Sequence, residues 1–321
     1  MPTVYLHCGA PKTGTSYMQV LFAKYSEELR AQGIVYPYDE FVAGAKDGKI
    51  TSGNGVKMAN YLLPELPHKI ADKTAFIDEF DHMLENGNGA NFLFSSEFLV
   101  FPDTERTKRL VKVIEKNGYD AKVIYLVRDY ANAARSAYSQ KVKRAGEARC
   151  FEAFLKQWDP QYVHTINLIT AAFGAESLSV FNYEEQKADL ARLFFEIFLG
   201  CSINIEVKVV INRSLNDKEL ELLRVFNEFS GGSNAFSSTF VSDALMQNST
   251  TESEDYTPRQ SELKILHERF NQLIADINSV VLGRAVQISS GCHEAPEKAV
   301  LNDFERFTMA VLSKLVGMRQ R

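Results

Sequence analysis

The chain has 321 residues, of which 45% are hydrophobic, and a formal net charge of −5. This length supports one large core, or a core with an appended subdomain, and the mild acidity argues against a nucleic-acid binder, which is usually basic. No apolar run reaches membrane-spanning length, and Met1 leads toward a strand without any stretch typical of a signal peptide. We therefore expect a cytoplasmic protein with no integral membrane segment, whose oligomeric state the sequence leaves open.

Cysteine and histidine spacing argues against a metal site. The four cysteines are scattered and form no C-x-x-C pair, so we expect reduced thiols rather than zinc ligands or disulfides. The histidines show no metal-ligand spacing. The sequence therefore predicts no metal requirement.

The first predicted elements are a strand, a glycine-containing loop and a helix. An apolar run over 4–8 leads into the loop, and Tyr17, Leu21 and Phe22 recur behind it at helical spacing. Such a loop directs backbone N–H groups at one point, at the positive end of the helix dipole. This arrangement is typical of an anion site, most often one for phosphate.

The loop departs from the pattern that binds nucleoside triphosphates. Gly9 and Gly14 keep the spacing of G-x-x-x-x-G-K-[ST], but Thr15 stands where that pattern requires lysine. The lysine is Lys12, at the leading edge of the loop, so the loop suits a single phosphate with Lys12 above it. The groups predicted to hold it are the amides and hydroxyls of Thr13, Gly14, Thr15 and Ser16. The competing interpretation is a glycine turn that binds nothing.

The motif P-K-T-G-T-S over 11–16, after a strand, resembles the 5′-phosphate loop of sulfotransferases that use 3′-phosphoadenosine 5′-phosphosulfate (PAPS). In bacterial members the loop is often preceded by a histidine and followed by a glutamine, which His7 and Gln19 match here. The resemblance implies PAPS as the donor and 3′-phosphoadenosine 5′-phosphate (PAP) as the product.

Beyond the first helix, residues 33–37 predict a short strand that ends at a proline, and the glycine-rich stretch 38–60 predicts an irregular loop. A helix is expected over 72–85.

A candidate catalytic carboxylate follows the next strand. Residues 91–96 read as a buried strand, and Glu97 comes directly after it. Functional groups of open parallel sheets lie at the carboxyl ends of strands, so Glu97 has the position of a functional carboxylate. The alternative is that Glu97 caps a helix or is simply solvated. The Ser-Ser-Glu sequence over 95–97 resembles the strand end that supplies the catalytic base in bacterial sulfotransferases. Glu97 is therefore the predicted base, and His7 is the next candidate.

A third strand end carries a candidate phosphate ligand. A helix over 104–117 is followed by an apolar strand over 121–127, then Arg128 and a helix that bears Ser136. An arginine offers bidentate contacts to phosphate, and a hydroxyl adds a neutral donor. The spacing of Arg128 and Ser136 resembles the family's 3′-phosphate signature. The alternative is that Arg128 pairs with a neighbouring acid.

The following elements extend the alternation of strands and helices. Helices are expected over 151–158 and 162–173, a strand over 178–181, and an apolar helix over 189–199; Tyr183 and Glu184, just after the strand, are interpreted as structural. An extended run over 205–211 leads to N-R-S-L-N over 212–216, which resembles a family segment. Arg213 is a candidate for the 3′-phosphate, but Ser214 and Asn216 are equally typical helix N-caps, and both interpretations stay open.

The last third is expected to be helical. A helix is predicted over 217–229, then a mobile loop or lid over 230–256, and amphipathic helices over 261–281 and 297–316. We expect a PAPS-binding core over 1–216, with 217–321 packed on it as part of one domain.

Together these elements predict an α/β fold of the P-loop type: a three-layer sandwich with a central parallel sheet of about four or five strands and a helical C-terminal layer. The predicted function is sulfuryl transfer from PAPS to a hydroxyl or amine, with Glu97 as the base and Lys12 neutralising the leaving phosphate, without a metal. The acceptor, a small molecule or a glycan, is a guess from the family alone. The alternatives are a P-loop kinase that uses ATP and magnesium, and a non-catalytic nucleotide-binding module.

Overall fold

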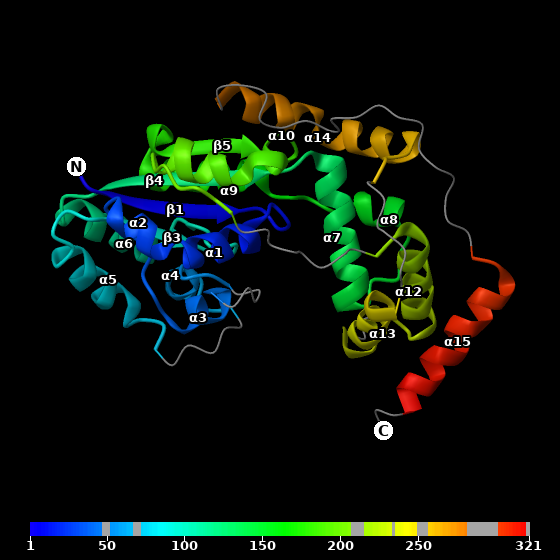
Figure 1. Cartoon of the computed structure of the whole chain (residues 1–321). Coiled ribbons are helices and arrows are strands. Elements are labelled where there is room, and N and C mark those ends of the chain that lie inside the picture. The colour runs from blue at the N-terminus through cyan, green and yellow to red at the C-terminus, as the bar shows by residue number, and fades with distance from the viewer. Residues whose placement is uncertain are drawn as a thin grey trace. The chain divides into compact units, whose positions relative to one another are not determined.

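The computed structural model describes residues 1–46, 52–66, 72–206, 215–232, 235–248, 256–280 and 301–318 (Figure 1). Within them lies a five-stranded sheet in the order β2-β3-β1-β4-β5, and every pair of neighbouring strands is parallel. The strands are β1 (Thr3–Gly9), β2 (Ile34–Val35), β3 (Asn91–Ser95), β4 (Asp120–Val127) and β5 (Leu178–Asn182). The predicted α/β class with a parallel sheet of four or five strands is confirmed.

The burial of each strand follows from its place in the sheet. All seven residues of β1 are buried, which fits the central position and explains why most of them are apolar. By contrast, the edge strand β5 is mostly half-buried.

One face of the sheet is covered by an apolar cluster in which Leu21 and Phe22 pack with Phe194 and with the strand residues Leu93 and Ile124. Helices on this side are α1 (Thr15–Lys24), α2 (Ser26–Ala31), α3 (Glu40–Lys46) and α11 (Leu190–Arg192), followed by a π-helical turn, Leu193–Phe198. Burying such side chains contributes roughly 1.5–3 kcal/mol each, so this cluster fixes α1 against β1.

The other face is covered by further helices. The ring of Phe80 lies 5.5 Å from that of Phe94 on β3, and the ring of Tyr162 lies 6.4 Å from that of Tyr125 on β4. The helices concerned are α5 (Phe76–Glu85) and α9 (Tyr162–Phe173), together with α4 (Val56–Leu62) and α6 (Glu105–Lys116), which contact α5.

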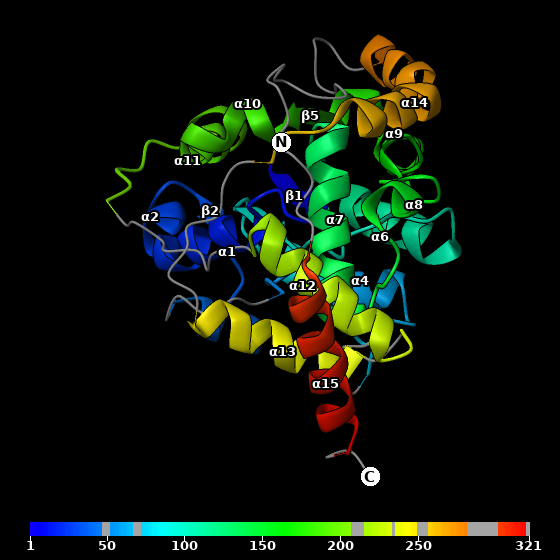
Figure 2. The same cartoon turned by 90° about the vertical axis from the view of Figure 1, so that its right-hand side faces the viewer.

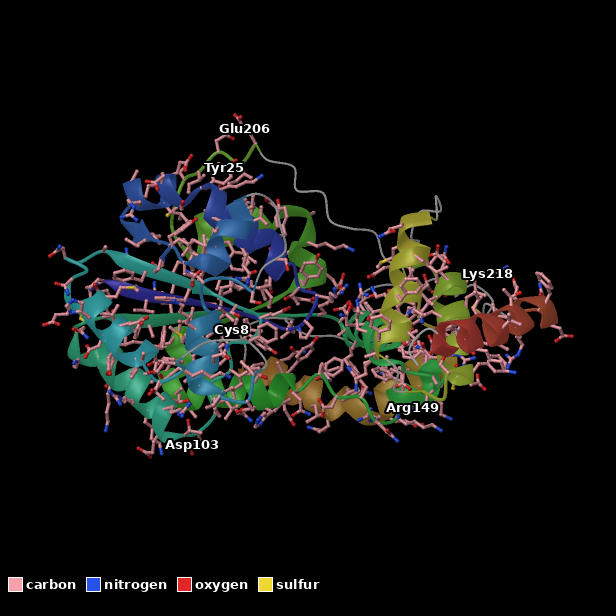
Figure 3. The ribbon with its side chains drawn as sticks, turned by 90° about the horizontal axis from the view of Figure 1, so that it is seen from below. Cys8, Tyr25, Asp103, Arg149, Glu206 and Lys218 are labelled. Carbon is pink, nitrogen blue, oxygen red and sulfur yellow. The ribbon has the colours of Figure 1, made fainter. Side chains whose placement is uncertain are left out.

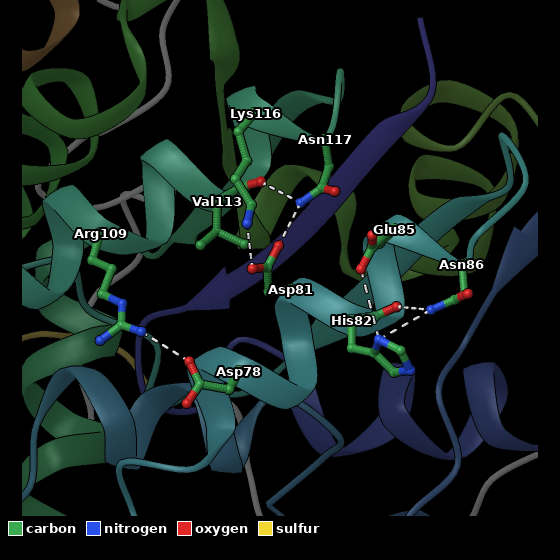
Figure 4. A network of polar contacts seen from close by, with 9 residues as sticks. All are labelled: Asp78, Asp81, His82, Glu85, Asn86, Arg109, Val113, Lys116 and Asn117. Carbon is green, nitrogen blue, oxygen red and sulfur yellow. Dashed lines mark hydrogen bonds and ion pairs between the residues drawn. The ribbon is translucent and has the colours of Figure 1, made fainter.

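A network of hydrogen bonds and ion pairs links α5 and α6 at the surface (Figure 4). Arg109 donates to Asp78 over 2.8 Å, Asn117 donates to Asp81 over 2.8 Å, and Lys116 also pairs with Asp81. Exposed ion pairs contribute little stability, so α5 and α6 are held together mainly by their buried apolar faces. The polar network adds specific contacts between the two helices.

The structure divides into two compact units. The first unit comprises Met1–Arg128, Gln161–Val210 and the end of α14 from Leu273 onward. It contains the sheet, and also α10 (Tyr183–Gln186) and the 3-10 turns Ala175–Ser177 and Lys187–Asp189. A predicted boundary at residue 216 stays a prediction.

The second unit is helical (Figure 2). Its α12 contacts α7, α13 and α15, and the ring of Tyr130 lies 4.5 Å from that of Phe270. The helices are α7 (Tyr130–Ala145), α8 (Phe151–Leu155), α12 (Asp217–Phe229), α13 (Ala235–Asn248), α15 (Asp303–Met318) and the larger part of α14 (Gln260–Val280). No helix in the described ranges is long and apolar enough to cross a membrane.

Two stretches predicted to be irregular contain helices. Residues 38–60 include α3 and the start of α4, and residues 230–256 include the 14-residue α13. The serine-rich composition predicted an exposed loop, but three serines of α13 face inward: Ser237, Ser238 and Ser242. Ser238 donates to Asn227 over 2.7 Å.

Part of the predicted extended run over 205–211 lies outside the described residues. At its start, the backbone N–H of Glu206 donates to the hydroxyl of Tyr25 over 3.0 Å, and both residues are labelled in Figure 3.

Candidate functional site

The three predicted site regions lie at the same edge of the sheet. In the register, Ser95 of β3 pairs with His7, and Leu126 of β4 pairs with Gly9. Since all three strands are parallel, Glu97 and Arg128 follow their strands at the edge where the loop follows β1. The chain moves from β1 to one side of the sheet and later crosses to β4 on the other. Ligands of open α/β sheets bind at such a switch point.

The loop after β1 has the backbone of an anion site. Lys12 and Gly14 both adopt the left-handed conformation, with φ of 67° and 78°, and Gly14 is the N-cap of α1. The loop is braced by two hydrogen bonds: Ala10 N–H donates to the Leu126 carbonyl over 3.0 Å, and the Thr13 hydroxyl donates to the Ala10 carbonyl over 2.7 Å. The first N–H groups of α1 have no partner within the helix, and together with the dipole they attract an anion.

Both glycines of the loop are required by close approaches. A Cβ on Gly9 would lie 2.5 Å from Oγ1 of Thr15 and 2.8 Å from Oγ1 of Thr13. A Cβ on Gly14 would lie 2.6 Å from Leu190. The spacing that the sequence shares with triphosphate loops therefore has a steric basis in this chain.

The side chains of the loop divide between structure and binding. Thr13 is buried and its hydroxyl is used inside the loop. Thr15 is also buried, and its Oγ1 has no hydrogen-bond partner among the described residues. Ser16 is half-buried and Lys12 is exposed. An unpaired buried hydroxyl is costly, so a partner for the Thr15 hydroxyl is expected in the working protein.

Glu97 and Lys12 lie close enough to interact. Partial burial raises the pKa of Glu97 above its ordinary value, and the Lys12 ammonium acts in the opposite direction. Glu97 as a whole residue is nevertheless exposed, so its side chain is open to solvent on one side. A carboxylate with a raised pKa is a stronger proton acceptor than an ordinary glutamate.

His7 lies beneath the loop in the core. Its side chain has 0% exposure, its Nδ1 is 2.8 Å from the Ser95 hydroxyl, and its ring packs 4.4 Å from that of Phe194. Burial lowers the pKa of His7 to about 3, so the ring is neutral. An acceptor in solvent does not reach it, and the structure favours the packing role for His7 over that of the base.

Arg128 is held by an acid, as the alternative interpretation of the sequence had it. Its Nε donates to Glu184 over 2.7 Å, and its Nη1 donates to the Lys12 carbonyl over 3.3 Å. The guanidinium also lies 5.1 Å from the ring centre of Tyr183. Arg128 therefore ties the left-handed Lys12 of the loop to Tyr183 and Glu184 in the segment after β5, and the structural role of these two residues stays a prediction.

Two predicted ligands of the 3′-phosphate are not placed at this site. Ser136 is half-buried on α7, which belongs to the second unit, and its pairing with Arg128 stays a prediction. Arg213 and Ser214 lie outside the described residues. Asn216 is a helix N-cap: its Oδ1 accepts the Glu219 N–H over 2.9 Å, and Glu219 accepts the Asn216 N–H over 3.0 Å.

Two further buried side chains contact the site region. Gln19 is buried, and both polar atoms of its amide have no partner in the described part of the chain. Asn54 hydrogen-bonds the end of β3, which leads to Glu97. Sequence reasoning missed Asn54; the only signal was an asparagine between two glycines.

Comparison with known proteins gives remote likenesses. No family model and no curated protein matches the chain. Among solved structures, a sulfotransferase from Alicyclobacillus acidocaldarius is 18% identical, with a TM-score of 0.39, over 78% of this chain and 97% of that one. A sulfotransferase domain from the curacin biosynthetic pathway is 13% identical, with a TM-score of 0.38, over 84% of this chain and 97% of that one. What the site does is therefore inferred from its own residues.

Proposed function

We propose that the chain is a sulfotransferase that moves the sulfuryl group of PAPS to a hydroxyl or amine of an acceptor. The observation that carries the proposal is the pairing of a single-phosphate loop with Glu97: the exposed Lys12 of that loop is close enough to lower the pKa of a carboxylate that partial burial raises. A phosphate clamp and a proton acceptor beside each other are what group transfer from a phosphosulfate requires.

The loop would hold the 5′-phosphate of the donor. Amides at the start of α1 and the unpaired Thr15 hydroxyl supply hydrogen bonds, and Lys12 supplies a positive charge. Thr15 stands where a triphosphate loop has its lysine, so that position of the loop supplies no cation for a β/γ-phosphate pair. We assign the 3′-phosphate to Arg128, Ser136 and Arg213.

In the reaction the acceptor oxygen or nitrogen attacks sulfur in line with the bond to the 5′-phosphate. The new bond to sulfur forms as the bond between sulfur and the bridging phosphate oxygen breaks. Glu97 takes the proton that the acceptor loses, and the electron pair of the broken bond stays on PAP. Lys12 and the loop amides neutralise that charge, so the scheme needs no metal ion.

The acceptor is proposed by class only. A glycan or a small molecule with a hydroxyl group follows from the family resemblance, and its contacts are not assigned to residues of this chain.

A transfer assay tests the proposal. Sulfur-labelled PAPS is incubated with the protein and a panel of sugars, phenols and amines, and labelled product is separated and counted. Wild type should label at least one acceptor, and Glu97→Gln should label it far more slowly. Glu115→Gln, an exposed carboxylate on α6, serves as the matched control and should behave as wild type.

Two results would contradict the proposal. The first is transfer of phosphate from ATP and magnesium with no transfer from PAPS, which would make the chain a P-loop kinase. The second is tight PAP binding without transfer to any acceptor class, which would make it a nucleotide-binding module.

A further inference from the structure

The strand that precedes Glu97 has an incomplete neighbour. β2 pairs with β3 at two positions only, Ile34 with Asn91 and Val35 with Phe92. From Leu93 onward, β3 continues toward the site without a β2 partner on that side. Backbone groups left unpaired inside a protein are costly, so other groups must satisfy them.

The side chain of Asn54 replaces the missing strand. Its Oδ1 accepts the Ser95 N–H over 2.9 Å, and its Nδ2 donates to the Leu93 carbonyl over 2.8 Å. A carboxamide carries the same donor and acceptor as a peptide group, so it can continue a sheet by one position. Asn54 is only 4% exposed, and these hydrogen bonds are therefore shielded from water.

Two glycines let the backbone approach β3 closely. A Cβ on Gly53 would lie 2.1 Å from the Ser95 carbonyl oxygen, and one on Gly55 would lie 3.1 Å from it. Gly53 also has φ of 74°, a conformation that favours glycine. The N–H of Gly55 donates to that same carbonyl over 3.1 Å. The segment Gly53-Asn54-Gly55 thus holds both backbone groups of Ser95.

These contacts fix the end of β3 from both sides. On the side of β1, the Ser96 N–H donates to the His7 carbonyl over 3.1 Å. On the other side, Asn54 and Gly55 hold Ser95, two residues before Glu97. We propose that Asn54 is a positioning residue, which holds the end of β3 so that the carboxylate of Glu97 stays beside Lys12. The proposal rests on the proposed function insofar as Glu97 is the base.

A double-mutant cycle separates positioning from plain stability. Asn54→Ala should lower kcat by about 10- to 100-fold, because small displacements of reacting groups cost about that much, and should change PAP affinity by only a few-fold. In a Glu97→Gln background the same change should cause almost no further loss of kcat, since the residue acts through Glu97. A merely structural role would lower the rate in both backgrounds.

The matched control is Asn60→Ala. Asn60 is a second buried asparagine, with 0% exposure against 4% for Asn54, but its Nδ2 donates to the Val56 carbonyl within α4 over 2.9 Å. It should lower the melting temperature without changing kcat beyond about twofold. If Asn54→Ala does not fold, Asn54→Asp is used, which keeps the shape and the acceptor but loses the donor to Leu93.

A readout independent of turnover is the titration of the Glu97 carboxyl, followed by carbon-13 NMR. Loosening the strand end both admits water, which lowers the Glu97 pKa, and weakens the Lys12 contact, which raises it. Burial is the larger of the two causes, so the Asn54 variant should move the Glu97 pKa down toward its ordinary value, whereas the Asn60 variant should leave it unchanged. An unchanged Glu97 titration in the Asn54 variant, or equal loss of kcat in both backgrounds, would overturn the inference. If PAPS transfers no sulfuryl group at all while the titration still moves, the proposed function fails and the positioning by Asn54 stands.

Discussion

At the scale of single residues, Glu97 carries the most direct prediction. Replacing it with glutamine keeps the shape and removes the proton acceptor, so kcat should fall by roughly 10²–10⁴-fold, the usual contribution of a general base. PAP affinity should remain within a few-fold of wild type, because in the proposed reaction Glu97 contacts the acceptor and not the donor. Steady-state kinetics and PAP titration measure both. Near-wild-type turnover would place the base elsewhere, and loss of PAP binding would make Glu97 a structural carboxylate.

The pair of Glu97 and Lys12 predicts a change in titration. Burial raises the pKa of Glu97 and the Lys12 ammonium lowers it, so removing the ammonium should raise that pKa further. In Lys12→Ala, an NMR titration should place the Glu97 transition at higher pH than in wild type. PAP affinity should fall in the same variant, because Lys12 contacts the donor phosphate in the proposed complex. An unchanged transition would mean that the two side chains do not interact in solution.

His7 predicts how stability depends on pH. Its pKa is lowered to about 3 by burial, whereas an unfolded histidine titrates near about 6.5. Between these values the unfolded chain binds a proton that the folded chain does not, so the free energy of unfolding should fall as pH drops below about 6.5. Urea unfolding at several pH values should show a shallower decline for His7→Gln than for wild type. Equal declines would show that His7 is not buried in its neutral form.

At the scale of elements, the segment after β5 holds the loop after β1. All three guanidinium nitrogens of Arg128 have partners: Nε and Nη2 contact Glu184, and Nη1 contacts the Lys12 carbonyl. The proposed 3′-phosphate contact would use the second N–H groups of Nη1 and Nη2. Arg128→Ala should weaken PAP more than adenosine 5′-phosphosulfate, which lacks the 3′-phosphate, as measured by calorimetric titration. An equal loss on both ligands would mean that Arg128 acts only by supporting the loop.

The N-terminus of α12 predicts how much its N-cap, Asn216, contributes to stability. Asn216 and Glu219 form a reciprocal capping box at the start of α12. Asn216→Ala should lower the free energy of unfolding by about 1 kcal/mol, because it removes the acceptor for one N–H of the first turn. Denaturant unfolding measures this. A loss below a few tenths of a kcal/mol would show that water replaces the cap without cost.

The elements predicted correctly from the sequence are those with a continuous apolar run or a clear helical periodicity of apolar residues. The apolar strands β1, β3 and β4 and the amphipathic helices α5 and α6 appear within a few residues of their predicted bounds. The helices in 38–60 and 230–256 were missed because glycine and serine there have tertiary roles. Gly53 and Gly55 permit an approach to Ser95, and the inward-facing Ser238 of α13 donates to Asn227, a tertiary contact that no local pattern reveals.

The candidate site was predictable to the extent that it depends on strand order. A parallel sheet places the ends of β1, β3 and β4 at one edge, so a loop, a carboxylate and an arginine that follow these strands converge. Two features depend on tertiary contacts and were beyond reach. One is the identity of the acid that pairs with Arg128, since Glu184 lies 56 positions away, and the other is the completion of β3 by Asn54.

At the scale of the whole molecule, the central claim is that the chain binds a nucleotide through one 5′-phosphate and a 3′-phosphate. A ligand that binds only the folded state stabilises it, and at a hundredfold excess over its dissociation constant the gain is about 2.7 kcal/mol. The most direct test is therefore thermal unfolding of the full chain with PAP, with ATP and magnesium, and without nucleotide. The account predicts that PAP raises the melting temperature by several degrees and that ATP with magnesium raises it much less. Stabilisation by ATP with magnesium and none by PAP would contradict it.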